Sequence, residues 1–196
     1  MFTGIVECMG EVIELTQAQN NLSITIQSPI SHELQIDQSV AHNGVCLTVV
    51  ACNQQTHTVT AIHETLIKTD VSQWKIGQKL NLERCLAANA RFDGHIVQGH
   101  VDTIAKCIQI IEQGGSWLYT FVYDHSGITV EKGSITVNGT SLTVVDSKDK
   151  QFSVAIIPYT YEHTVFHQLQ VNSIVNIEFD IVGKYIQRLL QQQIRL

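Results

Sequence analysis

The sequence has few charged residues and almost no proline. Of 196 residues, 15% are charged, 44% are hydrophobic and two are proline, which is a composition typical of a folded globular protein. Lys and Arg form no runs, and the net charge is −6. This balance argues against a nucleic acid or an anionic membrane as partner.

Long apolar runs and paired cysteines are also missing. No segment approaches the roughly 18 apolar residues of a membrane helix, and the start, MFTGIVE, lacks the regions of a signal peptide. The five cysteines include no CxxC spacing, so neither a disulfide framework nor a thiolate zinc site is predicted. We expect a cytoplasmic protein without a metal or another cofactor.

What the sequence does contain is a duplication with an offset of 95 residues. The segment SVAHNGVCLTVV at 39–50 returns as SITVNGTSLTVV at 134–145, and LNLER at 80–84 returns as VNIEF at 175–179. Because the register holds without drift, we infer two copies of a domain of about 90 residues, which is too long a unit for a solenoid repeat.

Each copy is rich in short segments of strand-like pattern. GEVIEL, LSITIQ, HTVTAI and KLNLER in the first copy correspond to TIAKCIQI, WLYTFVY, QFSVAII and IVNIEFD in the second. Asn43-Gly44 and Asn138-Gly139 are typical of type I′ hairpin turns. Several short strands per copy favour a small closed barrel, because closure removes exposed edges. ISHEL and ETLIKT can form short helices.

The tail, IVGKYIQRLLQQQIRL, is the only long helix-like segment. Val182, Ile186, Leu189 and Leu196 follow a 4-3-7 spacing, which makes a short coiled-coil stripe. Two interpretations remain open: the helix packs on its own barrel, or it mediates self-association.

Seven segments in order, MFTGIVE, SVAHNGVCLTV, NLER, FDGHIVQGHVD, KGSITVNGTSLTV, IPYT and VNIEFD, resemble the riboflavin synthase family along nearly the whole chain. The resemblance implies an all-β fold of two tandem, similar six-stranded Greek-key barrels and a C-terminal α-helix. The expected boundaries are 1–92 and 93–183 for the lumazine-binding barrels and 184–196 for an oligomerisation helix.

The resemblance also implies a reaction. Two molecules of 6,7-dimethyl-8-ribityllumazine exchange a four-carbon unit, giving riboflavin and 5-amino-6-(ribitylamino)uracil. The implied assembly is a homotrimer, with each active site between barrels of neighbouring subunits.

Repeated segments are the expected substrate-binding positions, since rigid backbone groups bind with little loss of entropy. By resemblance, the first copy binds through Gly4, Ile5, Val6, Cys46, Leu47, Thr48, Thr60, Ala61, Ile62, His63, Glu64 and Thr65. The second copy binds through Gly99, His100, Val101, Lys132, Ser141, Leu142, Thr143, Ala155, Ile156, Ile157, Pro158, Tyr159 and Thr160.

The copies differ where chemistry is expected. In the second copy, His100 stands at the position of Ile5, Ser141 at that of Cys46, and Asp180 at that of Cys85. Histidine titrates near neutral pH, so it suits proton transfer from an acidic methyl group. The predicted catalytic residues are Ser39, Cys46, His100, Ser141, Thr143 and Asp180. The recurring Glu83 and Glu178 are interpreted as structural.

Two rival functions differ in what they require. A lumazine- or flavin-binding antenna protein would share the fold but lose the polar residues of the second copy, which are all present here. A flavoprotein reductase needs a nicotinamide-binding domain, and no G-x-G-x-x-G segment lies between a strand and a helix.

Overall fold

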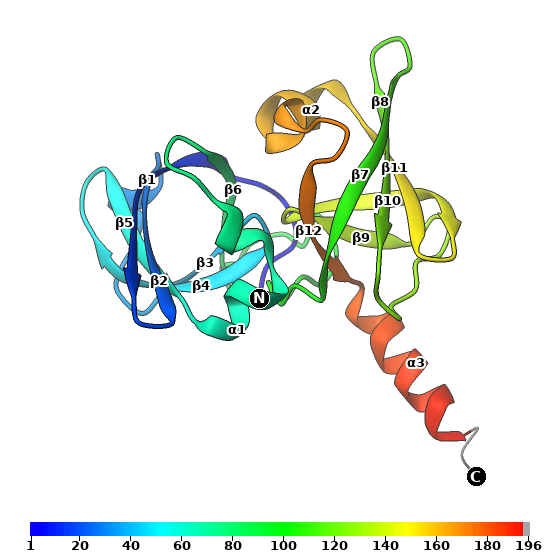
Figure 1. Ribbon diagram of the computed structural model, residues 1–196, viewed down its shortest axis with the longest axis horizontal. Coiled ribbons are helices and arrows are strands. Elements are labelled where there is room, and N and C mark those ends of the chain that lie inside the picture. The colour runs from blue at the N-terminus through cyan, green and yellow to red at the C-terminus, as the bar shows by residue number, and fades with distance from the viewer. Residues whose placement is uncertain (194–196) are drawn as a thin grey trace.

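The computed structural model describes residues 1–193 as two closed six-stranded barrels followed by a helix (Figure 1). The first barrel consists of β1 (Cys8–Ala18), β2 (Asn21–Gln27), β3 (Ser39–His42), β4 (Val45–Cys52), β5 (Thr56–Ala61) and β6 (Lys79–Arg84). The second consists of β7 (Thr103–Glu112), β8 (Trp117–Tyr123), β9 (Ser134–Val137), β10 (Thr140–Lys148), β11 (Gln151–Ile156) and β12 (Ile174–Phe179).

Both barrels have the same strand order. Around the first, the neighbours run β1-β2-β5-β4-β3-β6, and around the second they run β7-β8-β11-β10-β9-β12. The antiparallel order is that of a Greek key, and each strand of one copy has its counterpart in the other. The predicted fold class is therefore confirmed.

Each barrel has its own hydrophobic core. Alternation along β5 places His57, Val59 and Ala61 inside and the residues between them partly outside. Branched aliphatic residues fill the first core, whereas aromatic residues such as Phe121 and Phe152 add bulk to the second.

The barrels meet at the tips of the two repeated hairpins. Asn43 and Asn138 both have φ of 45°, and the glycines after them, Gly44 and Gly139, have φ of 80° and 76°, as expected for type I′ turns. A Cβ on Gly44 would lie 2.8 Å from the backbone nitrogen of Gly139. Only glycine permits this approach of the two tips.

Two asparagines form hydrogen bonds across this contact between the barrels, which we call the seam. The side chain of Asn81 donates to the carbonyl of Asn138 at 2.8 Å and accepts the amide hydrogen of Val165 at 2.9 Å. Asn176 mirrors it by donating to the carbonyl of Asn43 at 3.0 Å. The seam is thus an approximate two-fold arrangement of equivalent residues.

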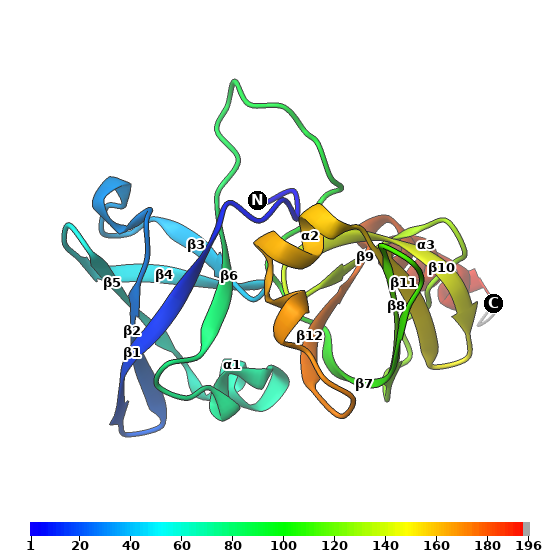
Figure 2. The ribbon, with the colours of Figure 1, turned by 90° about the horizontal axis from the view of Figure 1, so that it is seen from above.

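The helices lie outside the barrels. α1 (His63–Lys68) contains most of the ETLIKT segment and α2 (Pro158–His163) is its counterpart. Figure 1 shows them on opposite sides of the seam, and in Figure 2 the segment between β6 and β7 arches over it. None of the helices within residues 1–193 is long and apolar enough to cross a membrane.

The last helix, α3 (Ile181–Gln193), extends away from the second barrel (Figure 1). It begins three residues before the expected segment 184–196, because Asp180 caps it: the carboxylate accepts the amide hydrogen of Val182 at 3.0 Å. Ile186 and Leu189 remain 53% and 60% exposed, so the stripe is not buried on its own barrel. Leu196 lies outside the described residues.

Candidate active site

Two short segments connect the barrels to each other's hairpins. We call residues 3–6 the first strap and residues 98–101 the second strap. Gly4 in the first strap accepts the amide hydrogen of Ser141, in the second barrel, at 2.7 Å. Gly99 in the second strap accepts that of Cys46, in the first barrel, at 2.8 Å. Each strap leads into one barrel but lies against a strand of the other.

Glycine is required in both straps. Gly4 and Gly99 have φ of 78° and 75°, and a Cβ on either would lie 2.6 Å from the Cβ of Ser141 or Cys46, respectively. A side chain would therefore be strained by its backbone conformation and would displace the residue opposite. The contact explains why glycine recurs at this position of the duplication.

The two recurring glutamates hold the straps in place. Glu83 accepts the amide hydrogen of Thr3 at 2.7 Å, and Glu178 accepts that of His100 at 2.9 Å. Burial raises the pKa of both carboxyls, that of Glu178 to about 7. Their structural interpretation agrees with these contacts.

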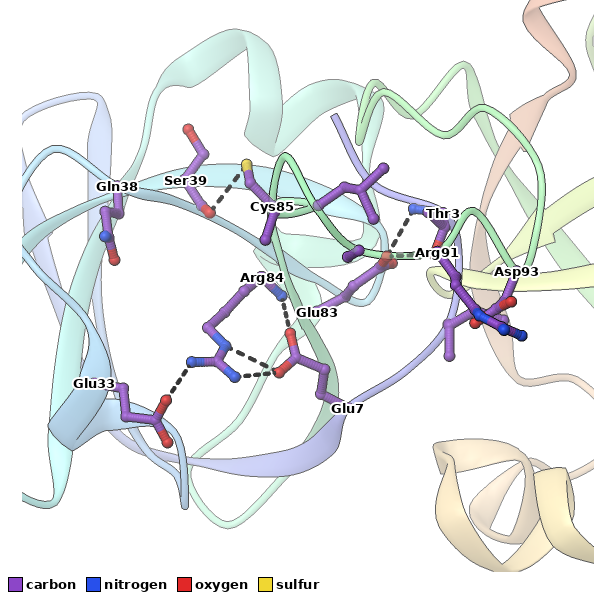
Figure 3. Close-up of a pocket in the computed structure, with 14 residues that line it drawn as sticks. Thr3, Glu7, Glu33, Gln38, Ser39, Glu83, Arg84, Cys85, Arg91 and Asp93 are labelled. Atoms are coloured by element: carbon purple, nitrogen blue, oxygen red, sulfur yellow. Dashed lines mark hydrogen bonds and ion pairs between the residues drawn. The ribbon is translucent and has the colours of Figure 1, made fainter.

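A cavity of about 640 Å³ opens beside the first strap (Figure 3). Ser39 and Cys85 line it, with the thiol of Cys85 donating to the Ser39 carbonyl at 3.5 Å. Arg84 spans part of the wall by pairing with Glu7 at 2.8 Å and Glu33 at 2.6 Å. The arrangement leaves polar groups facing a space large enough for a small molecule.

Cys46 does not line this cavity but packs against Phe2, Ala41 and Val97. Burial raises the pKa of its thiol, and a hydrogen bond with Ser39 offsets only part of the rise. A thiol with a raised pKa stays protonated at neutral pH, so it can donate a hydrogen bond but is a poor nucleophile. This favours a non-covalent role for Cys46.

The second barrel has a more polar group at the matching position. Ser141 lies 2.7 Å from Nδ1 of His95, whose Nε2 lies 3.2 Å from the hydroxyl of Thr136. Burial lowers the pKa of His95, and the carboxylate of Asp180 opposes that shift. Ser141 and Asp180, both predicted to be catalytic, therefore lie near one imidazole.

The pattern of the duplication did not predict His95 as a site residue. The 95-residue offset pairs the second copy with residues counted from Met1, so no residue of the first copy is compared with position 95. The sequence signal was the Gly94-His95 pair. In the structure a Cβ on Gly94 would clash with the carbonyl oxygen of Thr3. The backbone before His95 is therefore closely packed, and this fixes the position of the buried imidazole ring.

Comparison with known proteins matches both copies of the duplication. The lumazine binding domain model matches residues 3–85 and 98–180. Riboflavin synthase of Actinobacillus pleuropneumoniae is 39% identical over 97% of this chain and 90% of its own length, and that of Bacillus subtilis is 39% identical over 98% and 91%. The chain belongs to the riboflavin synthase family.

Solved structures extend the comparison of the fold. The crystal structure of LumP complexed with 6,7-dimethyl-8-(1'-D-ribityl) lumazine superposes with a TM-score of 0.84, covering 91% of this chain and 99% of that one at 20% identity. At this identity the likeness concerns the fold alone. It shows that this riboflavin synthase family member shares its paired barrels with a lumazine-binding protein.

The other predicted site residues differ in how exposed they are. Thr48, Thr143 and His100 have exposed side chains. Exposed or partly exposed side chains also come from the start of the two short helices and the residues before them: Thr60, Ile62, His63, Glu64, Thr65, Ala155, Ile157, Pro158, Tyr159 and Thr160. Val6 and Val101 are partly buried, and Val101 packs on the core of the first barrel.

Four predicted binding residues have side chains that pack in or against the barrel cores. Leu47, Ala61 and Ile156 are buried in the barrel cores, and Leu142 packs against the second core, so only their backbone groups remain for a ligand. Lys132 has φ of 63° and donates its amide hydrogen to Val144 at 2.8 Å. Its backbone forms a turn, and its side chain is exposed.

Proposed function

We propose that the protein is a riboflavin synthase that converts two molecules of 6,7-dimethyl-8-ribityllumazine into riboflavin and 5-amino-6-(ribitylamino)uracil. One observation carries the proposal. The chain matches riboflavin synthases over nearly its full length, and its copies differ at the three positions where one substrate must behave differently from the other: Ile5/His100, Cys46/Ser141 and Cys85/Asp180.

Two similar barrels would each hold one copy of the same substrate. The first would bind its lumazine beside Ser39 and Cys46, the second beside Ser141 and Thr143. His100 would move the proton of the acidic methyl group, since a histidine side chain can accept and release a proton as a general base and acid. Holding two rings with their reacting carbons aligned contributes about 7–11 kcal/mol in favourable cases, so positioning is expected to dominate.

The reacting pair would form between two subunits of a homotrimer. α1 and α2, which carry predicted binding residues, lie on opposite sides of the seam (Figure 1), so the two proposed sites of one chain would not face each other. The exposed stripe of α3, with Ile186 and Leu189, supports association through this helix. We place the protein in the cytoplasm, where the five cysteines, unpaired in residues 1–193, would stay reduced.

The test is turnover of the purified protein with the lumazine alone. We expect flavin absorbance to appear without an added cofactor, and His100→Ala and Cys46→Ala to lose about 10²–10⁴-fold in rate. His32→Ala is a matched control, because His32 is an exposed histidine of the first barrel outside the predicted site. Full activity of both site variants would refute the assignment of these residues.

A different outcome would refute the enzyme itself. A stable lumazine complex that yields no flavin would favour an antenna protein of the LumP type. Analytical ultracentrifugation tests the assembly separately, since a strictly monomeric but active protein would contradict a site shared between subunits.

A further inference from the structure

The second barrel contains a buried chain of three polar side chains. Thr136, His95 and Ser141 are joined by contacts of 3.2 Å at Nε2 and 2.7 Å at Nδ1 of the imidazole. Thr136 and His95 are 1% and 8% exposed, whereas Ser141 is partly exposed at the end of the chain. We propose that His95 is a positioning residue that fixes the hydroxyl hydrogen of Ser141, an inference that rests on the proposed function.

The chemistry follows from the two ring nitrogens. A neutral imidazole carries one N–H donor and one acceptor nitrogen, while each hydroxyl can donate or accept. If Nδ1 accepts, Ser141 points its hydrogen at the ring and offers lone pairs to a ligand. If Nδ1 donates, the hydrogen of Ser141 is free for the ligand. The first tautomer fixes the hydroxyl hydrogen on the ring nitrogen. The second occupies one lone pair of the Ser141 oxygen, so the hydroxyl hydrogen must point away from the ring.

The surroundings keep this ring neutral and immobile. Burial lowers the pKa of His95, with Asp180 opposing the shift in part. The backbone is fixed as well, because the amide of His95 donates to the carbonyl of Thr3 at 3.1 Å. The amide of Ser141 is held by Gly4, so the first strap positions both partners.

The first barrel has no equivalent chain. Its residues at the positions of Ser141 and Thr136 are Cys46 and Ala41, and Cys46 packs against apolar side chains there. A fixed hydroxyl is therefore available to only one of two identical substrates. This gives the two sites different hydrogen-bonding chemistry, as the unequal parts of the two lumazines require.

A double-mutant cycle tests whether His95 acts through Ser141. In the wild-type background, His95→Ala should lower kcat about 10-fold to 100-fold, which corresponds to loss of a buried hydrogen bond, with KM changed by less than about 2-fold. In a Ser141→Ala background the same substitution should change kcat by less than about 2-fold. An equal loss in both backgrounds would overturn the proposal.

Matched variants separate positioning from folding. Thr136→Val should reduce kcat less than His95→Ala, and its effect should also vanish in the Ser141→Ala background. Ser153→Ala removes a comparable buried hydroxyl pair, with Thr120 at 3.0 Å, and should leave kcat unchanged. If His95→Ala does not fold, His95→Gln replaces it in the cycle, since the amide can donate and accept but in a different geometry.

A spectroscopic measurement keeps the test independent of turnover. In ¹⁵N-histidine-labelled protein, the His95 ring signals, assigned by their loss in His95→Gln, should be those of one neutral tautomer at pH 7 and should shift in Ser141→Ala. Unshifted signals would overturn the inference even in an active enzyme. Shifted signals in a protein without turnover would support the Ser141 contact and place the failure in the proposed function.

Discussion

Acid should destabilise the first barrel through a pair of buried histidines. Nε2 of His42 lies 2.9 Å from Nε2 of His57, whose Nδ1 lies 2.9 Å from the hydroxyl of Ser31. Nδ1 of His42 lies 3.0 Å from the carbonyl oxygen of Val40, so it carries the hydrogen. The hydrogen between the rings then belongs to His57, and both rings are neutral. A further proton on His42 would place two N–H groups against each other between the rings, and one on His57 would require the hydroxyl of Ser31 to change from donor to acceptor.

The magnitude follows from the shifts in pKa. Burial lowers the pKa of His42 to about 3 and that of His57 to about 4, and in His42 the neighbouring ring adds to the effect. Both are near 6.5 in the unfolded chain. The neutral pair is therefore fully stabilising above pH 6.5, and stability is lost as the pH falls from there towards the folded values. At pH 5 the loss is about 2 kcal/mol per histidine, or about 4 kcal/mol together.

Other groups titrate in the same range and act in the opposite direction. Burial raises the pKa of Asp70 to about 6 and that of Glu178 to about 7, so protonation of these carboxyls favours the folded state as the pH falls. The raw slope of stability against pH mixes both effects. A variant that removes only the histidines isolates their share.

The equivalent positions of the second barrel show which residues can replace the two histidines. The positions of His42 and His57 are occupied there by Val137 and Phe152, both fully buried. Urea unfolding of wild type and of the double variant His42→Val/His57→Phe should be compared at pH 7.5 and pH 5. The wild type should lose about 4 kcal/mol more than the variant between the two values. Equal losses in both proteins would refute the reasoning.

The remaining predictions concern the seam, the straps and the last helix. Asn176→Ala leaves the amide of Asp70 without its partner at 2.9 Å and should lower the free energy of unfolding by about 1–3 kcal/mol in urea titrations; an unchanged midpoint would contradict this. Gly4→Ala should lower kcat at least about 10-fold. Gly77 has φ of 86° but nothing within 4 Å of an added Cβ, so Gly77→Ala should leave kcat unchanged. Equal effects of the two substitutions would show that the close contact at Gly4 is not the cause. Leu189→Glu should shift the sedimenting species to a smaller one and reduce turnover while lumazine still binds, and an unaltered oligomer would exclude α3 from the interface.

The duplication made much of the fold predictable. A constant offset with alternating strands sufficed for two closed barrels, and the Asn-Gly pairs fixed both hairpin turns, because few other residues take positive φ at two adjacent positions. The short helix α1 was recognisable from ETLIKT. The signals for the turns and for α1 are local in sequence, and the structure there depends on local conformation. The offset is a comparison between the two copies.

The contacts between the copies could not be read from the same pattern. An offset pairs Gly4 with Gly99, but it does not say that Gly4 contacts Ser141 rather than its own barrel. That choice depends on how the barrels dock, which is set by distant residues such as Asn81. His95 was not predicted because the offset pairs it with no residue of the first copy, and because its partner Ser141 is 46 residues away in sequence. The cap formed by Asp180 did have a local signal, an aspartate directly before a helical segment.

The docking of the barrels accounts for which residues repeat and which differ. At the seam, Gly44 lies against Gly139. A substitution at either glycine must therefore fit against the other, and this keeps the two hairpin tips alike. Cys46 and Ser141 instead face the straps and a partly open surface, where neither contacts the other. A substitution at one of them therefore changes only one of the two proposed sites. The approximate symmetry of the seam therefore leaves the two sites free to become chemically different, which a reaction between two identical substrates requires.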